Sequence, residues 1–321
     1  MPAAFDPFED FGDVGTLAER LEDPDPAARR VAVMALAETA DPDAIPHLAG
    51  TLTDEAREVR LQAAIALGEF DGPDAAAALA GALADADSAV AQAAADSLAE
   101  LKDPDAADSL FPYVAHDNAF VRRSALRALK ELRRSDALKP AVEALADPDA
   151  EVRAQAVGVI GYLQLEESLP ALMAAVRDPS PIVRRIAASA VGFSRAKPAG
   201  DAIGVLLDDS DWQVREVAAE TAGKSKLATA ADKLTALTGD DYWQVRLKAI
   251  RSLGALKVAA AIPAIVPSLD HKISNLRKEA AAALGEIADA AALQALEDHL
   301  NDPDPDVRKN LRWAIGRIRG A

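Results

Sequence analysis

A short sequence phrase recurs ten times in this chain of 321 residues at a constant spacing of 31, without insertion or deletion. Each copy has a small or apolar anchor residue, an Arg directly after the anchor in nine copies, and an Asp five residues before it in eight. The anchors are Ala28, Val59, Val90, Val121, Val152, Val183, Val214, Val245, Leu276 and Val307. A fixed period of this length indicates stacked units that cannot bury their apolar faces alone. It therefore predicts a single repeat domain over residues 13–321.

Each repeat is predicted to contain two helices. The second begins three residues before the anchor, and its apolar face follows a helical spacing, as in Val121, Ala125 and Leu129. The residues expected to cap its start are Asp25, Asp87, Asn118, Asp149, Ser180, Asp211 and Asp304. The glycines expected to form its C-terminal turn are Gly68, Gly161, Gly192, Gly223, Gly254, Gly285 and Gly316. A shorter first helix carries pairs such as Leu48 and Leu52. The sequence thus predicts an all-α chain.

The charge of the chain is unevenly distributed. The net charge is −17; residues 1–111 carry 6 basic and 24 acidic side chains, whereas residues 112–321 carry a net +1. Such asymmetry is expected where the two parts meet different partners, or where an acidic surface keeps an Ala-rich protein soluble. It argues against nucleic acid as the main ligand, because phosphate binding requires a cationic face.

The chain has no cysteine, which excludes disulfides and thiolate chemistry and is compatible with an intracellular location. The acidic N-terminus is unlike a signal peptide, and no apolar run reaches the roughly 18 residues of a membrane span. We therefore expect a cytoplasmic protein without membrane contact.

Residues 1–12 precede the first repeat and contain Phe5, Phe8 and Phe11 among acidic residues. One interpretation is that these aromatic side chains cover the open apolar end of the first repeat, as solenoids require. The other is that they form a docking peptide for another protein.

The phrase D-P-D-x-x-V-R followed by A-A-x-x-L-G resembles the HEAT repeat, in the short form found in phycobilisome-lyase proteins. Asp147–Arg153 and Asp302–Arg308 are examples. The resemblance covers 13–321. It implies a right-handed α-solenoid of about ten two-helix repeats, with the second helices on the inner, concave face. It also implies that the recurrent Asp and Arg pair between neighbouring repeats as a ladder, interrupted here at Ala91, His116 and His271.

Signals for an enzyme are weak. No Gly-rich phosphate loop, nucleophile elbow or cysteine nucleophile occurs, and the four histidines are His47, His116, His271 and His299. His116 and His271 occupy the same repeat position five units apart, which is too far for a shared metal. We expect no catalytic residue, no metal and no cofactor.

A candidate binding groove follows by elimination. If the anchor and the positions 1, 4, 5 and 8 residues after it form the core, positions 2, 3, 6 and 10 face the groove. Ser124 occupies one of these positions. The small residues Gly158 and Ser189 are expected to leave a depression beside Tyr162 and Phe193. The groove changes from acidic to basic and aromatic near repeat four. The residues predicted to bind there are Arg123, Arg127, Tyr162, Arg185, Ile186 and Phe193. Packing between repeats is the alternative role for Tyr162 and Phe193.

The motif Trp-Gln-Val-Arg occurs twice, at Trp212 and Trp243, each in the first turn of a second helix. Neighbouring repeats should place the two indoles side by side on the rim, about 10 Å apart. They either pack on the adjacent helix start or contact a partner.

The sequence therefore favours a non-catalytic scaffold that binds a protein or peptide in its groove, an acidic amphipathic helix being the simplest ligand. The alternative is a phycobilisome-lyase-like bilin lyase or chaperone subunit. The oligomeric state is left open.

Overall fold

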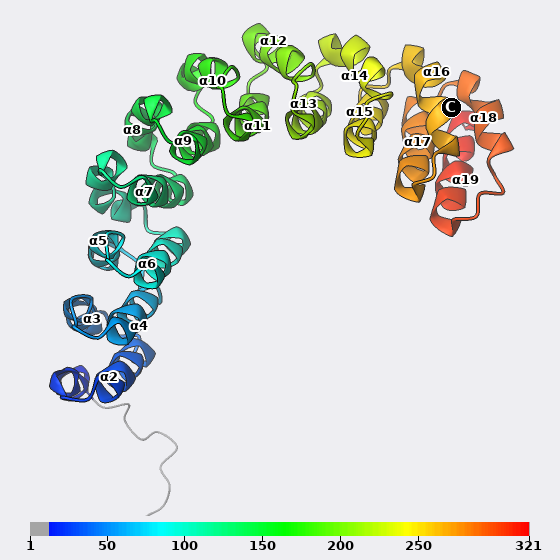
Figure 1. Ribbon diagram of the computed structural model, residues 1–321. Coiled ribbons are helices and arrows are strands. Elements are labelled where there is room, and N and C mark those ends of the chain that lie inside the picture. Colours follow the sequence, from blue (N-terminus) through cyan, green and yellow to red (C-terminus); the bar gives the residue numbers. More distant parts are fainter. Residues whose placement is uncertain (1–12, 321) are drawn as a thin grey trace, which may run out of the picture. The chain divides into compact units, whose positions relative to one another are not determined.

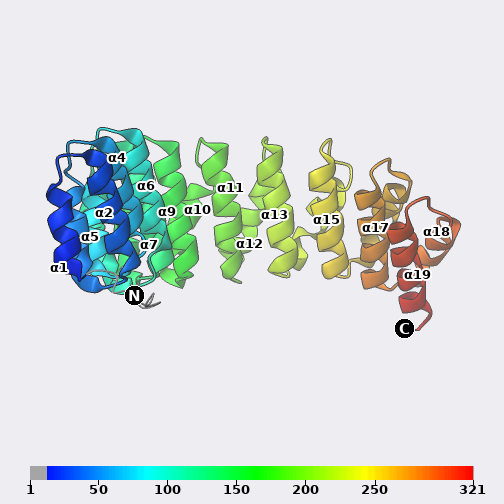
Figure 2. The same cartoon turned by 90° about the horizontal axis from the view of Figure 1, so that it is seen from below.

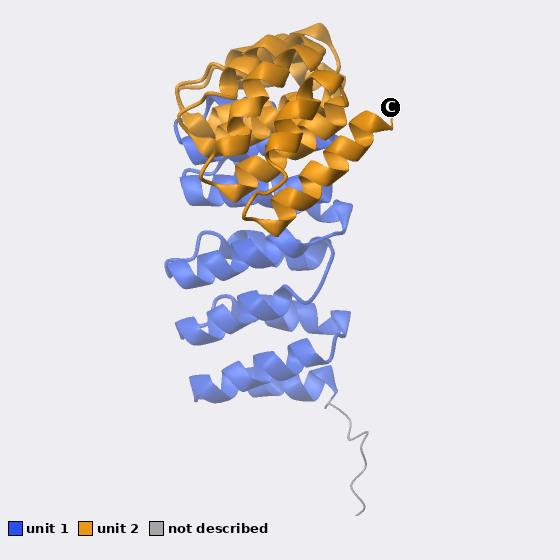
Figure 3. Ribbon diagram, turned by 90° about the vertical axis from the view of Figure 1, so that its right-hand side faces the viewer, with its two compact units in different colours: residues 1–163 blue, residues 164–321 orange. Residues whose placement is uncertain are grey.

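The computed structural model describes residues 13–320, so the predicted role of Phe5, Phe8 and Phe11 lies outside the described residues. Every regular element in the described part is helical. The chain divides into two compact units, residues 1–163 and 164–321, coloured separately in Figure 3. Both are built from the same 31-residue hairpin, and the single domain over 13–321 stays a prediction.

The first unit contains five hairpins, each with its second helix longer than the individual segments of its first (Figure 1). The second helices are α2 (Pro26–Glu38), α4 (Arg57–Leu67), α6 (Ser88–Glu100), α7 (Ala119–Leu132) and α9 (Ala150–Leu163). The first helices include α1 (Val14–Glu19), α3 (Ile45–Thr51), α5 (Pro73–Ala82) and α8 (Leu138–Glu143). Short 3-10 turns complete several of them, and in the fourth repeat η3 (Pro104–Ser109) and η4 (Phe111–Ala115) form the whole first segment.

The second unit repeats this arrangement five times. Its second helices are α11 (Pro181–Ala190), α13 (Trp212–Lys224), α15 (Trp243–Ala255), α17 (Ser274–Ile287) and α19 (Pro305–Arg319). Its first helices are α10 (Leu169–Ala175), α12 (Lys197–Leu206), α14 (Ala231–Leu237), α16 (Ile262–Ile265) and α18 (Leu293–Asp298). Figure 2 shows α13, α15, α17 and α19 packed side by side. The predicted all-α solenoid of ten hairpins is confirmed.

The helix starts follow the predicted capping chemistry. The side chains of Asp87, Asp211 and Asp304 each accept hydrogen bonds from two amides of the following turn. Such bonds satisfy backbone N–H groups that have no partner inside the helix. Ser180 occupies the same position but its side chain makes no capping bond, so the prediction is wrong there.

The core is formed by the anchor and by the residues 4, 5 and 8 positions after it, and in most repeats also by the residue 7 positions after it. In α7 these are Val121, Ala125, Leu126, Ala128 and Leu129, each with at most 1% of its surface exposed. The residue seven positions after the anchor is buried because successive second helices pack directly on one another. Position 3 is not uniformly on the open face, since Ser124 is 5% exposed and its assignment to the groove was wrong.

The recurrent glycines permit close helix packing rather than a left-handed turn. Of the described glycines, only Gly72 has a positive φ. A Cβ built on Gly254 would lie 2.8 Å from the Cα of Ala283, and one on Gly285 would lie 2.4 Å from the ring of Trp313. The predicted C-terminal turn occurs at Gly68, the C-cap of α4, but it is wrong for Gly223, Gly254, Gly285 and Gly316, which lie inside their helices. Glycine is needed because the next helix occupies the space of a side chain.

A left-handed backbone conformation does occur twelve positions after the anchor, at residues that are not glycine. Ala40, Arg133, Gln164, Lys226, Lys257 and Ala288 all have φ between 51° and 58°. For these side chains this conformation costs roughly 1 kcal/mol, a strain that glycine avoids.

Replacing Ala288 by glycine should therefore raise the free energy of unfolding by about 0.5–1 kcal/mol, because glycine is the favoured residue in a left-handed helix terminus. Chemical denaturation of both proteins measures the difference. The matched control is Ala77→Gly in the middle of α5, where the same change should cost about 1 kcal/mol. If both substitutions changed the free energy of unfolding in the same direction, the prediction would be contradicted.

Candidate binding surfaces

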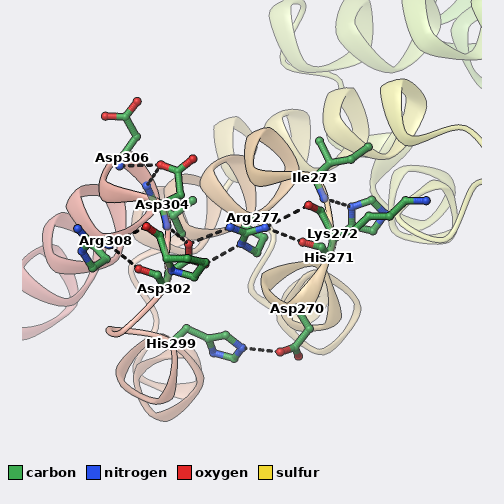
Figure 4. Close-up of polar contacts among 12 residues, drawn as sticks. Asp270, His271, Lys272, Ile273, Arg277, His299, Asp302, Asp304, Asp306 and Arg308 are labelled. Carbon is green, nitrogen blue, oxygen red and sulfur yellow. Dashed lines mark hydrogen bonds and ion pairs between the residues drawn. The ribbon is translucent and has the colours of Figure 1, made fainter.

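The Asp and Arg of the repeat phrase form the predicted ladder between neighbouring repeats. In each described rung the Arg donates from Nε to one carboxylate oxygen of the Asp in the next repeat. The rungs are Arg29–Asp54, Arg60–Asp85, Arg122–Asp147, Arg184–Asp209, Arg215–Asp240 and Arg277–Asp302, with Nε···O distances of 2.6–2.8 Å. The second guanidinium nitrogen, Nη2, donates to the other carboxylate oxygen, as in Arg277 to Asp302 at 2.9 Å (Figure 4). This bidentate geometry fixes the relative position of two repeats.

The other half of each rung is bonded to backbone. Nη1 of Arg277 donates to the carbonyl oxygens of His271 and Lys272 in its own repeat, and Asp302 accepts from the amide of Asp304 (Figure 4). The side chains of Arg277 and Asp302 are 12% and 5% exposed, so the rung is largely buried. Removing one partner of such a rung should cost more than the roughly 0–1 kcal/mol of an exposed ion pair, because it leaves a buried charge unpaired.

Hydrogen bonds from Arg277 and the Asp304 amide hold the pKa of Asp302 below its usual value, against the opposing effect of burial. A carboxylate with a lowered folded pKa contributes stability that is present above its unfolded pKa. That contribution is lost as the pH falls through the folded pKa. The ladder is therefore expected to weaken only in acid.

Two interruptions replace the ladder Asp by histidine. Nδ1 of His116 accepts from the Asn118 amide at 3.1 Å, and Nδ1 of His271 accepts from the Ile273 amide at the same distance. The imidazole thus retains the backbone contact of the Asp but not its charge. The predicted interruptions at Ala91, His116 and His271 are confirmed. Arg134, which lies off the ladder, is not isolated, because it pairs with Asp108 at 2.9 Å and also with Asp136.

Three predicted groove residues belong to the first unit, and each already contacts another side chain. Arg123 lies 5.2 Å from the Phe120 ring centre. Arg127 pairs with Asp96 at 3.0 Å, while Tyr162 accepts a hydrogen bond from Arg133 at 2.6 Å and remains 39% exposed. The guanidinium of Arg133 also covers the tyrosine ring at 4.6 Å. Sequence reasoning missed Arg133.

The other predicted residues belong to the second unit. Arg185 donates to Gln213 at 3.2 Å, and Ile186 and Phe193 are half-buried. The Trp212 ring stacks on Tyr242 at 5.0 Å and 8°, so the expected neighbour Trp243 is not its stacking partner. Tyr242 lies at the start of α15 and is 45% exposed. The rim therefore combines packing with an exposed aromatic face.

A charge cluster on α13 and α15 joins two repeats. Glu220 accepts from Lys224 and Lys248, both at 2.8 Å. These two hydrogen bonds lower the pKa of Glu220 to about 2. Because Glu220 is 30% exposed, solvent screening reduces the energy of the cluster.

Replacing Glu220 by glutamine should lower the unfolding free energy by about 1–2 kcal/mol at neutral pH. The difference from the unmodified protein should be constant above about pH 6 and should shrink as the pH falls from the unfolded pKa of 4.5 through the folded pKa of about 2, because the carboxylate becomes protonated in both states only below the folded pKa. Denaturation curves at several pH values measure it. A difference that does not shrink between pH 6 and pH 2 would show that the loss arises from packing rather than charge.

A depression at the C-terminal end of the second unit was not among the binding residues predicted from the sequence. It is lined by Lys257, Ala288, Arg312, Trp313, Gly316, Arg317 and Gly320, with a volume of about 610 Å³. Trp313 is 42% exposed, and the Arg317 guanidinium lies 5.9 Å from its ring centre. The signal was available, because Trp313 and Arg317 occupy groove positions in the last repeat.

Within residues 13–320, no group of three or more His, Asp or Glu side chains is placed to hold a metal ion. None of the helices formed by these residues is sufficiently long and apolar to span a bilayer.

The family model for HEAT repeats matches residues 14–95, 80–147, 138–221 and 231–316. The chain therefore belongs to the HEAT-repeat family. This model does not distinguish the phycobilisome-lyase-like class that the sequence suggested. No curated protein matches the sequence.

Solved structures share the fold at low sequence identity. A crystal structure of an engineered protein matches with a TM-score of 0.52 and 21% identity, over 96% of this chain and 99% of that one. A structure described as Kap95p binding to RanGDP matches with a TM-score of 0.59 and 16% identity, over 96% of this chain and 48% of that one. Kap121p matches with a TM-score of 0.55 and 14% identity, over 95% and 41%. The chain spans about half the matched chain in the Kap95p structure.

Proposed function

We propose that this protein is a non-catalytic scaffold that binds another protein or a peptide through the open face of its second helices. The observation that carries the proposal is the composition of that face, which combines exposed cations with exposed aromatic side chains. Tyr162 and Trp313 are 39% and 42% exposed, and Arg133 and Arg317 lie against their rings. Aromatic and Arg side chains are the types that dominate binding energy at protein interfaces.

An acidic amphipathic helix is the simplest ligand for such a face. On the first unit its carboxylates would pair with Arg123 and Arg127, and its apolar side chains would pack on Tyr162. The second unit offers the same chemistry separately, in Arg185, Ile186 and Phe193. Arg127 would have to exchange its pairing with Asp96, a contact in which both side chains are about half exposed. An exposed ion pair of this kind costs little to exchange.

The test begins with affinity capture and mass spectrometry, followed by binding of the purified partner to the purified protein. The double change Tyr162→Ala with Arg127→Ala should weaken binding about thirtyfold, which corresponds to roughly 2 kcal/mol. Lys139→Ala, at an exposed position on the first helix α8, is the matched control. Binding that survives the double change but is lost on Trp212→Ala would place the working surface on the rim instead.

Co-expression with the enzymes of bilin synthesis separates the scaffold from the lyase alternative. A scaffold is expected to remain colourless. A coloured product that retains pigment through purification would favour bilin binding and contradict the proposal.

A further inference from the structure

The ladder position between repeats eight and nine holds an arginine that faces a histidine. Arg246 occupies the position that in the six described rungs donates to a carboxylate of the next repeat, and the residue opposite is His271. Within residues 13–320 the one hydrogen-bond partner of Arg246 is the carbonyl oxygen of Asp240, in its own repeat. By contrast, Arg215 donates to both carboxylate oxygens of Asp240 and to two carbonyls.

The surroundings of this arginine are cationic. Burial lowers the pKa of His271, and the positive charges of Arg246, Lys272 and Arg277 lower it further. The imidazole is therefore held neutral, and Nδ1 is committed to the Ile273 amide. Lys272 is exposed to solvent, whereas Arg277 is committed to Asp302. The position thus has positive charge and unused N–H donors, without the carboxylate that the other rungs supply.

The comparable interruption in the first unit lacks this excess of charge. At His116 the opposing ladder residue is Ala91, so the arginine and the aspartate have both been replaced. When both partners are lost, no unpaired cation remains. When only the aspartate is lost, the arginine is left without a partner.

An exposed aromatic side chain lies at the start of the same helix. Tyr242 is the N-cap residue of α15, four residues before Arg246 in the sequence. Its ring is 45% exposed and is held by stacking on Trp212. A flat, fixed aromatic ring at the start of the helix that also carries the arginine suits a ligand that has a carboxylate and an apolar group.

We propose that Arg246 and Lys272, with His271 between them, form a binding site for a carboxylate of a partner protein. The carboxylate is that of an Asp or Glu side chain, and an apolar residue next to it packs on Tyr242. The described rungs supply the chemical argument, because each shows an arginine at this position binding a carboxylate through two nitrogens. The inference rests on the proposed scaffold function but uses the rim, not the open face tested above.

The site can be tested with a small ligand and the full chain. 3-Phenylpropionate is the probe, and the neutral 3-phenylpropionamide is the matched control. Binding is followed by the nuclear magnetic resonance signal of the Arg246 Nη–H groups, because the Nε–H group already donates to the carbonyl oxygen of Asp240. We expect this signal to shift with the acid and not with the amide, and Tyr242→Ala to reduce the affinity severalfold.

The decisive variant is His271→Asp, which supplies the carboxylate from within the chain and completes the rung. It should raise the melting temperature and reduce binding of 3-phenylpropionate at least tenfold, whereas Arg195→Gln should change neither. An Arg246 signal that ignores the acid, or a His271→Asp protein that binds as well as the original, would overturn the proposal. Neither outcome bears on partner binding through Tyr162 and Arg127, so the two proposals can fail separately.

Discussion

Replacing Gly254 by alanine is expected to lower the free energy of unfolding by about 2–3 kcal/mol, although alanine is the better helix former. The added Cβ would lie 2.8 Å from the Cα and 2.9 Å from the Cβ of Ala283 in the next second helix. Both atoms belong to a packed helix rather than to a flexible side chain, so α15 and α17 would have to separate. Urea denaturation followed by circular dichroism measures the loss.

Gly316 provides a matched control at the same repeat position. It lies in α19, and nothing lies within 4 Å of a Cβ built on it. Gly316→Ala should therefore be neutral or stabilising by up to about 1 kcal/mol, through helix propensity alone. If both substitutions changed stability equally, close packing would not be the reason for glycine at this position.

Replacing Arg215 by leucine is expected to cost about 2–4 kcal/mol, because it leaves the carboxylate of Asp240 buried without its partner. The side chain of Asp240 is 5% exposed, and that of Arg215 is 15% exposed. Arg215 also donates to the carbonyl oxygens of Asp209 and Ser210 at 2.8 and 3.2 Å. Its loss should therefore loosen the contact between α13 and α15 as well as the start of α13.

A double-mutant cycle separates the ion pair from these other effects. Asp240→Asn alone and together with Arg215→Leu should give a coupling energy above about 1 kcal/mol. Arg195→Leu is a better control than Arg134→Leu, because Arg134 is itself paired with two aspartates. A coupling energy near zero would mean that the rung aligns the repeats without stabilising them.

The sequence alone determined the repeat unit and its polar framework. The anchors, the helix caps and the ladder partners all recur with the period, and each is a local or nearest-neighbour feature. Val121 and Ala125 are fixed by helical spacing, and the pairing of Arg184 with Asp209 follows from their constant separation of 25 residues. Such features are predictable because each repeat contacts mainly its neighbours.

The tertiary structure decided how closely the helices approach and which exposed groups have partners. The glycines suggested a turn, but the packing of α15 on α17 showed that Gly254 makes room for a helix. Arg127 and Tyr162 were predicted on the open face, but their contacts with Asp96 and Arg133 depend on side-chain reach between repeats. The stacking of Trp212 on Tyr242 rather than beside Trp243 has the same origin. A repeat period fixes which positions are neighbours, whereas the distance and orientation of their side chains follow from packing.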